Sequence, residues 1–207
     1  MAATMNELVA REHARELLRA AAERRMRAGA RTRPRRARRL KERQERVLLP
    51  DGRRVHVRRL RRADRDMYGE AVAALSERSR YLRFASPMPK LSESMLDHMT
   101  AVDDSDHVAY AALAPRQDEI VGVARFVTVP DAPLTGEVAV AVADTWQGLG
   151  LGSVLLATII ERAQRANLRR LVAVTLSENH AAIQLARAVG FTRARSDGIY
   201  RQYERPL

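Results

Sequence analysis

The sequence contains no cysteine, only two lysines among its basic residues, and no long apolar run. Without cysteine the chain forms no disulfide, no thiolate nucleophile and no cysteine-ligated metal site. Its apolar runs fall short of the roughly 18 residues that a membrane-spanning helix needs. Charged residues interrupt the first twenty positions, which argues against a secretory signal. We therefore expect a cytoplasmic protein that makes no contact with membranes.

Charge is abundant, and it is unevenly distributed along the chain. Residues 24–65 hold nineteen basic and four acidic side chains, whereas residues 66–207 are nearly neutral; the net charge of the whole chain is +12. A cluster this basic attracts polyanions through forces that salt screens. Two interpretations remain open at this point: an arm that contacts a polyanion, and a solvated linker with no partner.

The patterns of apolar and turn residues predict an N-terminal extension followed by one α/β domain. Residues 5–27 follow a helical pattern without glycine or proline and lead into an arginine-rich linker, so residues 1–46 form the predicted helical and basic extension. From residue 47 onward short strands alternate with helices, and Gly52 lies in the first predicted hairpin turn. This alternation predicts a mixed α/β sheet domain over residues 47–207.

Residues 147–153, QGLGLGS, join a predicted strand to a predicted helix that covers about 151–167. The first amides of a helix lack intrahelical partners and lie at the positive end of its dipole, so they favour anions. The spacing is not that of a Walker loop, because no Gly-Lys-Ser/Thr follows, and a dinucleotide fingerprint would need glycine at 153 or 155. The loop therefore predicts a different phosphate site, with a simple glycine-rich turn as the alternative.

Two motifs of this sequence resemble those of the GNAT superfamily of N-acetyltransferases. The segment from Gln147 to Gly152 is similar to its Q-x-x-G-x-G motif, which binds the pyrophosphate of acetyl-CoA. A second segment is similar to its N-x-x-A-x-x-L-x-x-x-x-G-F motif, and the matching residues are Asn179, Ala182, Leu185, Gly190 and Phe191. The resemblance implies a mixed, mostly antiparallel sheet flanked by helices, with acetyl-CoA as co-substrate and no metal.

The same resemblance implies a set of cofactor-binding residues. Backbone groups of the strand before the loop would bond the pantetheine arm, the loop amides would hold the pyrophosphate, and an amide near Val142 would polarise the thioester carbonyl. The implied residues are Val140, Ala141, Val142, Gln147, Gly148, Leu149, Gly150, Leu151, Gly152, Ser153 and Asn179. A helix N-cap is an alternative role for Asn179, and the two roles are compatible.

Acetylation of an amine needs a base that removes a proton from the nucleophile. In many GNAT relatives a glutamate at the start of the corresponding strand serves as this base, and Glu137 holds that position, with Val138 and Val140 expected to shield it. The alternative is a solvated charge at a strand end. Many relatives also carry a tyrosine that acts as general acid where this chain has Ala186. A thiolate leaving group scarcely needs protonation at pH 7, because the pKa of a thiol is about 8.5.

Residues 75–84, LSERSRYLRF, resemble a block of bacterial protein lysine acetyltransferases that walls the acceptor groove. The resemblance implies a protein lysine as the acceptor, with a small-molecule amine as the second choice. Tyr81 and Phe84 would equally serve as core anchors. A rival of another class is a nucleic-acid-associated protein whose arginine-rich arm is carried by a GNAT fold, although residues 24–65 offer no aromatic ring to stack on bases. No histidine has metal-ligand spacing.

Overall fold

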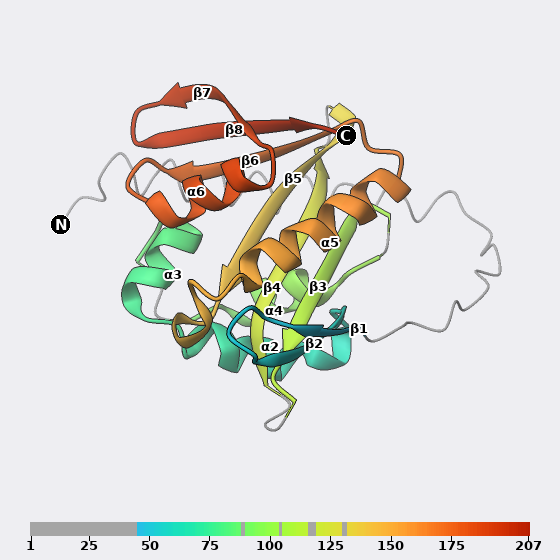
Figure 1. The fold of residues 1–207 in the computed structure, drawn as a ribbon, viewed down its shortest axis with the longest axis vertical. Coiled ribbons are helices and arrows are strands. Elements are labelled where there is room, and N and C mark those ends of the chain that lie inside the picture. Colours follow the sequence, from blue (N-terminus) through green and yellow to red (C-terminus); the bar gives the residue numbers. More distant parts are fainter. Residues whose placement is uncertain (1–44, 88–89, 104, 116–118, 130–131) are drawn as a thin grey trace. The chain divides into compact units, whose positions relative to one another are not determined.

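The computed structural model describes residues 45–207, except 88–89, 104, 116–118 and 130–131. The predicted helix over residues 5–27 and most of the arginine-rich linker lie outside the described residues, so the division after residue 46 stays a prediction. The described part is a mixed, mostly antiparallel sheet with helices on both faces (Figure 1). It confirms the predicted fold class.

Within the described residues, eight strands form one sheet in the order β1-β2-β3-β4-β5-β6-β8-β7. Every neighbouring pair is antiparallel except β5 and β6, which run parallel. The strands are β1 (Glu45–Leu48), β2 (Arg54–Arg59), β3 (His107–Leu113), β4 (Ile120–Val129), β5 (Ala132–Val142), β6 (Arg170–Leu176), β7 (Thr192–Asp197) and β8 (Tyr200–Pro206). The first two form the predicted hairpin, and Gly52 in its turn has φ +84°.

The helices of the described part follow the predicted order. They are the 3-10 turn η1 (Arg62–Asp64), α2 (Arg65–Ala73), α3 (Glu77–Phe84), α4 (Glu93–Thr100), the 3-10 turn η2 (Asp144–Trp146), α5 (Leu151–Arg165) and α6 (His180–Ala188). Ser92 caps α4 as predicted, because its side chain accepts a hydrogen bond from the amide of Met95 at 3.3 Å.

The sheet carries a separate apolar layer on each face. One layer packs the sheet against α5 and α6, and Phe126, Leu155 and Tyr203 are among its buried members. The other packs the sheet against α2 and α4 and contains Tyr68 and Val123. Because both faces of the central strands are covered, most residues of β3 and β4 are buried rather than alternating with exposed ones.

Helix α5 forms because its apolar residues recur with helical spacing. Leu151, Leu155 and Ile159 lie four residues apart and are fully buried against the sheet. The helix begins after Gly150 and ends at Arg165, two residues before the predicted end, because Asn167 takes a left-handed conformation with φ +60° that breaks the helix. Figure 1 shows α5 lying across β3, β4 and β5, which brings its N-terminus to the end of β5.

Several arginines of the predicted basic segment are used within the fold. Arg58 forms a buried ion pair with Asp64, with nitrogen and oxygen 2.7 Å apart. Arg65 bonds Asp97 at 2.8 Å, and Arg53 donates to a backbone carbonyl at 2.9 Å. These side chains make intramolecular contacts within the described residues.

Candidate active site

The sheet opens between β5 and β6. The parallel pairing of the two strands ends where Glu137 lies opposite Val172. Beyond that point β5 continues to Val142 alongside β4, and β6 continues to Leu176 alongside β8. The two strands therefore diverge, as Figure 1 shows. The narrow end of the wedge between them is at Glu137, the last residue of β5 that pairs with β6.

The β5 side of this wedge presents backbone groups that pair with no neighbouring strand. The amide of Ala143 donates to the carbonyl oxygen of Val121 on β4 at 2.9 Å. Because hydrogen-bonding directions alternate along an antiparallel strand, Ala141 also directs its backbone groups toward β4, whereas Val140 and Val142 direct theirs toward the wedge. Two of the three residues expected to bond a pantetheine arm thus have the required orientation, and Ala141 contributes only cavity wall.

The glycine loop brings the N-terminus of α5 to the wide end of the wedge. Gly148 and Gly150 adopt φ +74° and +84°, a region that favours glycine, and Gly150 is the N-cap of α5. The first backbone bond of the helix runs from the amide of Val154 to the carbonyl oxygen of Gly150 at 3.2 Å. The amides of residues 151–153 precede that bond, so they have no acceptor within the helix and remain available to an anion.

Gly152 is needed for a different reason, which is helix packing. A Cβ atom at this position would lie 2.9 Å from Cδ2 of Leu185, so the absence of a side chain lets α6 approach α5 closely. Leu149 and Leu151 pack in the apolar layer under α5, and neither lines the cavity. Ser153, in contrast, is one of the residues that line the cavity.

The side chain of Gln147 is occupied by contacts within the protein. Its amide nitrogen donates to the carbonyl oxygen of Val142 at 3.1 Å and to the hydroxyl of Ser79 on α3 at 3.2 Å. The first bond satisfies the acceptor of Val142 and leaves its N–H as the free group at the wedge. Gln147 therefore supports the loop and the strand edge with its side chain.

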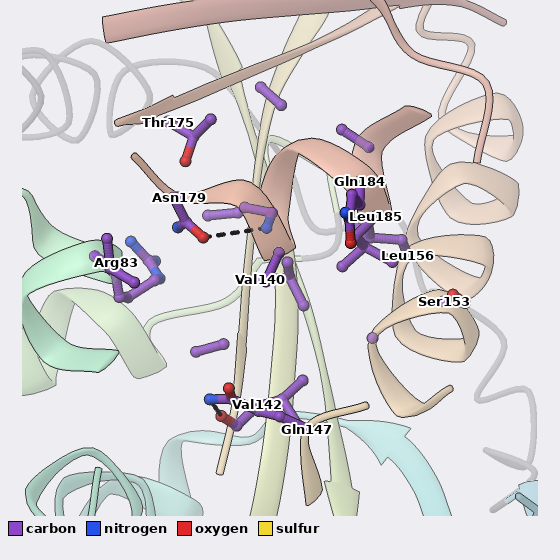
Figure 2. A pocket seen from close by; sticks show the side chains of 18 of the residues that line it. Arg83, Val140, Val142, Gln147, Ser153, Leu156, Thr175, Asn179, Gln184 and Leu185 are labelled. Carbon is purple, nitrogen blue, oxygen red and sulfur yellow. Dashed lines mark hydrogen bonds between the residues drawn. The ribbon is translucent and has the colours of Figure 1, made fainter. Parts of the chain in front are cut away.

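Asn179 begins α6 on the opposite side of the wedge. Its side-chain oxygen accepts a hydrogen bond from the amide of Ala182 at 3.1 Å, which is the N-cap role that the sequence left open. The residue also lines the cavity, and Figure 2 shows it between Val140 and Arg83. The capping bond uses only the oxygen, so the side-chain NH₂ group stays available to a ligand.

A cavity of about 560 Å³ occupies the wedge, a size typical of ligand pockets (Figure 2). Its walls come from β5, β6, α3, α5 and α6. Nine of the eleven predicted cofactor-binding residues line it, and they are Val140, Ala141, Val142, Gln147, Gly148, Gly150, Gly152, Ser153 and Asn179. An apolar strand edge with free N–H groups beside a helix N-terminus suits a ligand that carries amides and a diphosphate.

Glu137 lies at the narrow end of the wedge but is not among the residues that line the cavity. Val138 and Val140 belong to the apolar layer under α5, and side chains alternate along a strand, so Glu137 points to the opposite face. The expected shielding of Glu137 by these valines is therefore wrong. Its charge instead interacts with that of Arg83 on α3.

Arg83 is a functional candidate that the sequence reasoning missed. The side chain lines the cavity, is half-buried, and lies over the ring of Phe84 at 5.0 Å from the ring centroid. Burial lowers the pKa of Arg83; the charges of Tyr68 and Glu137 oppose this shift, whereas that of Arg125 adds to it. The described residues offer its guanidinium no hydrogen bond or ion pair. The only signal was its place in the block 75–84.

The position of the tyrosine that many GNAT relatives carry is part of the cavity wall. Ala186 is buried and lines the cavity, so it presents no acidic hydrogen there. Tyr203, which also contacts the cavity, is 2% exposed and belongs to the apolar layer, as expected for a packing residue. Helix α6 therefore contributes no tyrosine to the cavity wall, because its sequence contains none.

The described residues contain no group of three histidine, cysteine, aspartate or glutamate side chains arranged to hold a metal ion. No helix in this part of the chain is long and apolar enough to span a bilayer. His98 and His107 stack with ring centroids 5.7 Å apart, and burial together with the charge of Arg125 lowers the pKa of His107 to about 3.

The chain is similar to known acetyltransferases in sequence. Residues 70–191 match the Acetyltransferase (GNAT) family. An acetyltransferase of Pseudomonas aeruginosa is 34% identical over 149 residues, which cover 71% of this chain and 80% of that protein. The acetyltransferase Pat of Mycolicibacterium smegmatis is 30% identical over 122 residues, 59% of this chain and 36% of Pat, so the chain spans about a third of that relative.

Solved structures show the same likeness. The GNAT domain of PAT from S. lividans superposes with a TM-score of 0.74 and 29% identity, covering 80% of this chain and 97% of that domain. The protein yncA from Salmonella typhimurium, solved with its cofactor acetyl-CoA, has a TM-score of 0.57 and 21% identity over 74% of this chain and 94% of that one, which shows a shared fold. The chain is thus an acyltransferase that belongs to the GNAT acetyltransferase family.

Proposed function

We propose that this enzyme transfers the acetyl group of acetyl-CoA to the side-chain amine of a protein lysine. One observation carries the assignment of acetyl-CoA: the wedge between β5 and β6 joins a strand edge with free amides to the N-terminus of α5, which no side chain caps. A diphosphate suits the helix terminus, and an arm with two amide groups suits the strand edge. Both features lie in one cavity.

The order of these groups along the wedge indicates where the reacting carbonyl would lie. Val142 is next to the loop that would hold the diphosphate, and Val140 is two residues closer to Glu137. The thioester is at the end of the arm that is remote from the diphosphate, so it would lie nearer to Val140. We therefore assign the polarising hydrogen bond to the N–H of Val140, not to an amide near Val142 as the sequence suggested.

We assign cofactor binding to the α5 and α6 side of the cavity and acceptor binding to the α3 side. Gly152, Ser153 and Asn179 line the cavity from α5 and α6, whereas Ser79 and Arg83 line it from α3. When bound, acetyl-CoA supplies a thioester carbonyl that an amine can attack, with the thiolate as leaving group. The amine would then enter on the α3 side, which is the face to which Glu137 points.

Glu137 would take the proton that the amine loses. It is separated from the cavity lining, so we propose that the proton travels through a water molecule. The Arg83 cation near this path would disfavour a second positive charge, and it would thereby help to deliver the acceptor as a neutral amine. The leaving thiolate needs no acid at Ala186.

The acceptor class rests on helix α3. The block 75–84, which resembles bacterial protein lysine acetyltransferases, contributes Leu75, Ser79, Leu82 and Arg83 to the cavity wall. On the other wall Val174 is 42% exposed and lines the same cavity, so the entrance offers apolar surface to more than an isolated amine. An extended peptide segment that carries a lysine would use both walls.

The test compares acceptors at a fixed concentration of acetyl-CoA. The full chain is incubated with lysine-containing proteins and peptides, and in parallel with small amines such as polyamines and free lysine. We expect kcat/KM to be highest for lysine within a polypeptide, with loss of activity when that lysine is replaced by arginine. Turnover of small amines alone would refute the protein acceptor and support the alternative, and failure to bind acetyl-CoA in calorimetry would refute the function itself.

A further inference from the structure

Helix α3 forms one wall of the cavity and joins an apolar layer only through the partly buried Phe84. None of its eight residues is fully buried. Apolar packing therefore contributes less to its position than it does for α5, whose buried face holds six residues. Other contacts must set where α3 lies relative to the cofactor loop.

Those contacts converge on Asp144, the first residue of η2. One carboxylate oxygen accepts from the amide of Ser76 at 2.8 Å. The other oxygen accepts from the hydroxyl of Ser76 at 2.8 Å and from that of Ser79 at 2.6 Å. Ser76 is also the N-cap of α3, since its hydroxyl oxygen accepts from the amide of Ser79. A single carboxylate thus holds the first turn of α3.

The electrostatics favour this contact. Burial raises the pKa of Asp144, but the hydrogen bonds from Ser79 and Ser76 outweigh it, and the net pKa lies below the ordinary value. The side chain is therefore a carboxylate at neutral pH. It faces the N-terminal end of α3, where the helix dipole favours negative charge, and its bonds are of the stronger, charge-assisted kind.

The same network continues to the strand edge that would hold the cofactor. The hydroxyl of Ser79 donates to Asp144 and accepts from the side-chain amide of Gln147. Gln147 in turn donates to the carbonyl oxygen of Val142 on β5. Two side chains of one short turn, which leads directly into Gly148, therefore connect α3 to the cofactor loop.

On the far side of the wedge α3 has a weaker contact. Arg78 forms an ion pair with Glu178 at 2.8 Å, next to Asn179, but both side chains are about half exposed. Exposed pairs of this kind contribute about 0–1 kcal/mol. Asp144 makes three hydrogen bonds to α3 and its N-cap, against this single ion pair, so it is the most extensive polar contact between α3 and the cavity walls in the described residues.

We propose that Asp144 is a positioning residue that couples the cofactor loop to the acceptor wall. When a diphosphate orders the residues after Gln147, the bonds of Asp144 to Ser76 and Ser79 transmit that order to α3. Leu82 and Arg83, which α3 directs into the cavity, are then held where the acceptor amine enters. The inference depends on the proposed use of acetyl-CoA and adds a physical link between its two substrate sites.

The test measures hydrogen exchange of the full chain with and without saturating acetyl-CoA. In the unaltered protein we expect acetyl-CoA to slow exchange both at residues 150–154 and at the α3 amides of residues 80–84. A coupling of ordinary strength corresponds to about fivefold or more at α3. In Asp144→Ala the protection at 150–154 remains and the α3 effect disappears, with acetyl-CoA affinity within about threefold.

Two further variants test whether the effect is specific to the hydrogen-bond network of Asp144. Ser79→Ala removes one arm of the same network, so the double variant with Asp144→Ala adds little to the single one. Asp66→Ala removes a carboxylate that is 92% exposed on α2 and serves as the matched control, with the α3 effect retained. In kinetics, Asp144→Ala raises KM for the acceptor at least fivefold, whereas the control leaves it unchanged.

The outcomes separate the two proposals. If acetyl-CoA protects residues 150–154 but not α3 in the unaltered protein, or if Asp144→Ala and Ser79→Ala keep the full α3 effect, the coupling is refuted and the proposed function stands. If acetyl-CoA binds nowhere, the proposed function is refuted as well. Should Asp144→Ala fail to fold, Ser79→Ala alone decides the matter through the same two readouts.

Discussion

The replacement Ser153→Glu tests the anion site at the start of α5 with little risk to the fold. Ser153 is the third residue of the helix after the N-cap Gly150, and a glutamate at this position reaches back to the N-cap amide in many proteins. The new carboxylate would lie beside the amides of residues 151–153, which we assign to the diphosphate. The first turn of α5 carries no acidic residue, so the change adds a favourable dipole contact of about 0.3–1 kcal/mol.

The expected loss of affinity follows from Coulomb repulsion. Two unit charges about 4 Å apart interact by about 4 kcal/mol at an effective dielectric constant of 20. Screening by salt at this open end of the cavity reduces the value, so we take about 2–4 kcal/mol. Each 1.4 kcal/mol corresponds to about tenfold in affinity, which predicts weakening of acetyl-CoA binding by about 30-fold to 1,000-fold.

Isothermal calorimetry measures this loss, and thermal unfolding checks the fold. Ala157→Glu is the matched control, because Ala157 lies one turn further along the same helix, is exposed, and does not line the cavity. We expect Ser153→Glu to keep or slightly raise the unfolding temperature, and Ala157→Glu to leave affinity within threefold. An acetyl-CoA dissociation constant for Ser153→Glu within threefold of the unaltered protein would show that the diphosphate does not bind at this helix terminus.

The remaining predictions concern the base, acid stability and the basic segment. Glu137→Gln should lower kcat by about 10²–10⁴-fold while acetyl-CoA affinity stays within threefold; a kcat within threefold at every pH would exclude Glu137 as the base. His107 has a folded pKa of about 3, below its ordinary 6.5, so the unfolded state binds the extra proton and stability falls as pH drops from about 6.5 to 3, by up to about 1.4 kcal/mol per pH unit. Urea titrations should show that His107→Gln flattens this slope between pH 7 and 5, and an unchanged slope would contradict the assignment. Residues 24–65 should retain the chain on a polyanion column at low salt; elution that is independent of salt would support the solvated linker.

Local sequence patterns were sufficient for most of the helices and strands and for the geometry of the glycine loop. Apolar residues of α5 recur with helical spacing, and the glycines before it mark a backbone turn that few other residues allow. Helix capping is likewise local, because Ser92 and Asn179 bond amides only three residues away. These features depend on backbone geometry within a few residues, so they can be predicted before any tertiary contact is known.

The acceptor side could not be predicted in the same way. The alternation along β5 implies that Glu137 and Val138 face opposite sides, but only the packing of α5 decides which side is apolar. Arg83 is a functional candidate because it lines the same cavity as residues of β5, a strand that begins far along the chain. A local sequence pattern does not indicate which distant element will cover a given face of a strand.

The network around Asp144 shows the same division most clearly. The sequence by itself determined the family, the sheet, and a glycine loop suited to a diphosphate. Only the tertiary structure decided that Asp144 bonds Ser76, 68 positions earlier, and that Gln147 reaches Ser79 across the same separation. Hydrogen bonds at such a separation require that the fold place the end of β5 beside α3. No periodicity or helix cap in either segment predicts these hydrogen bonds, because each segment can form its helix or turn without the other.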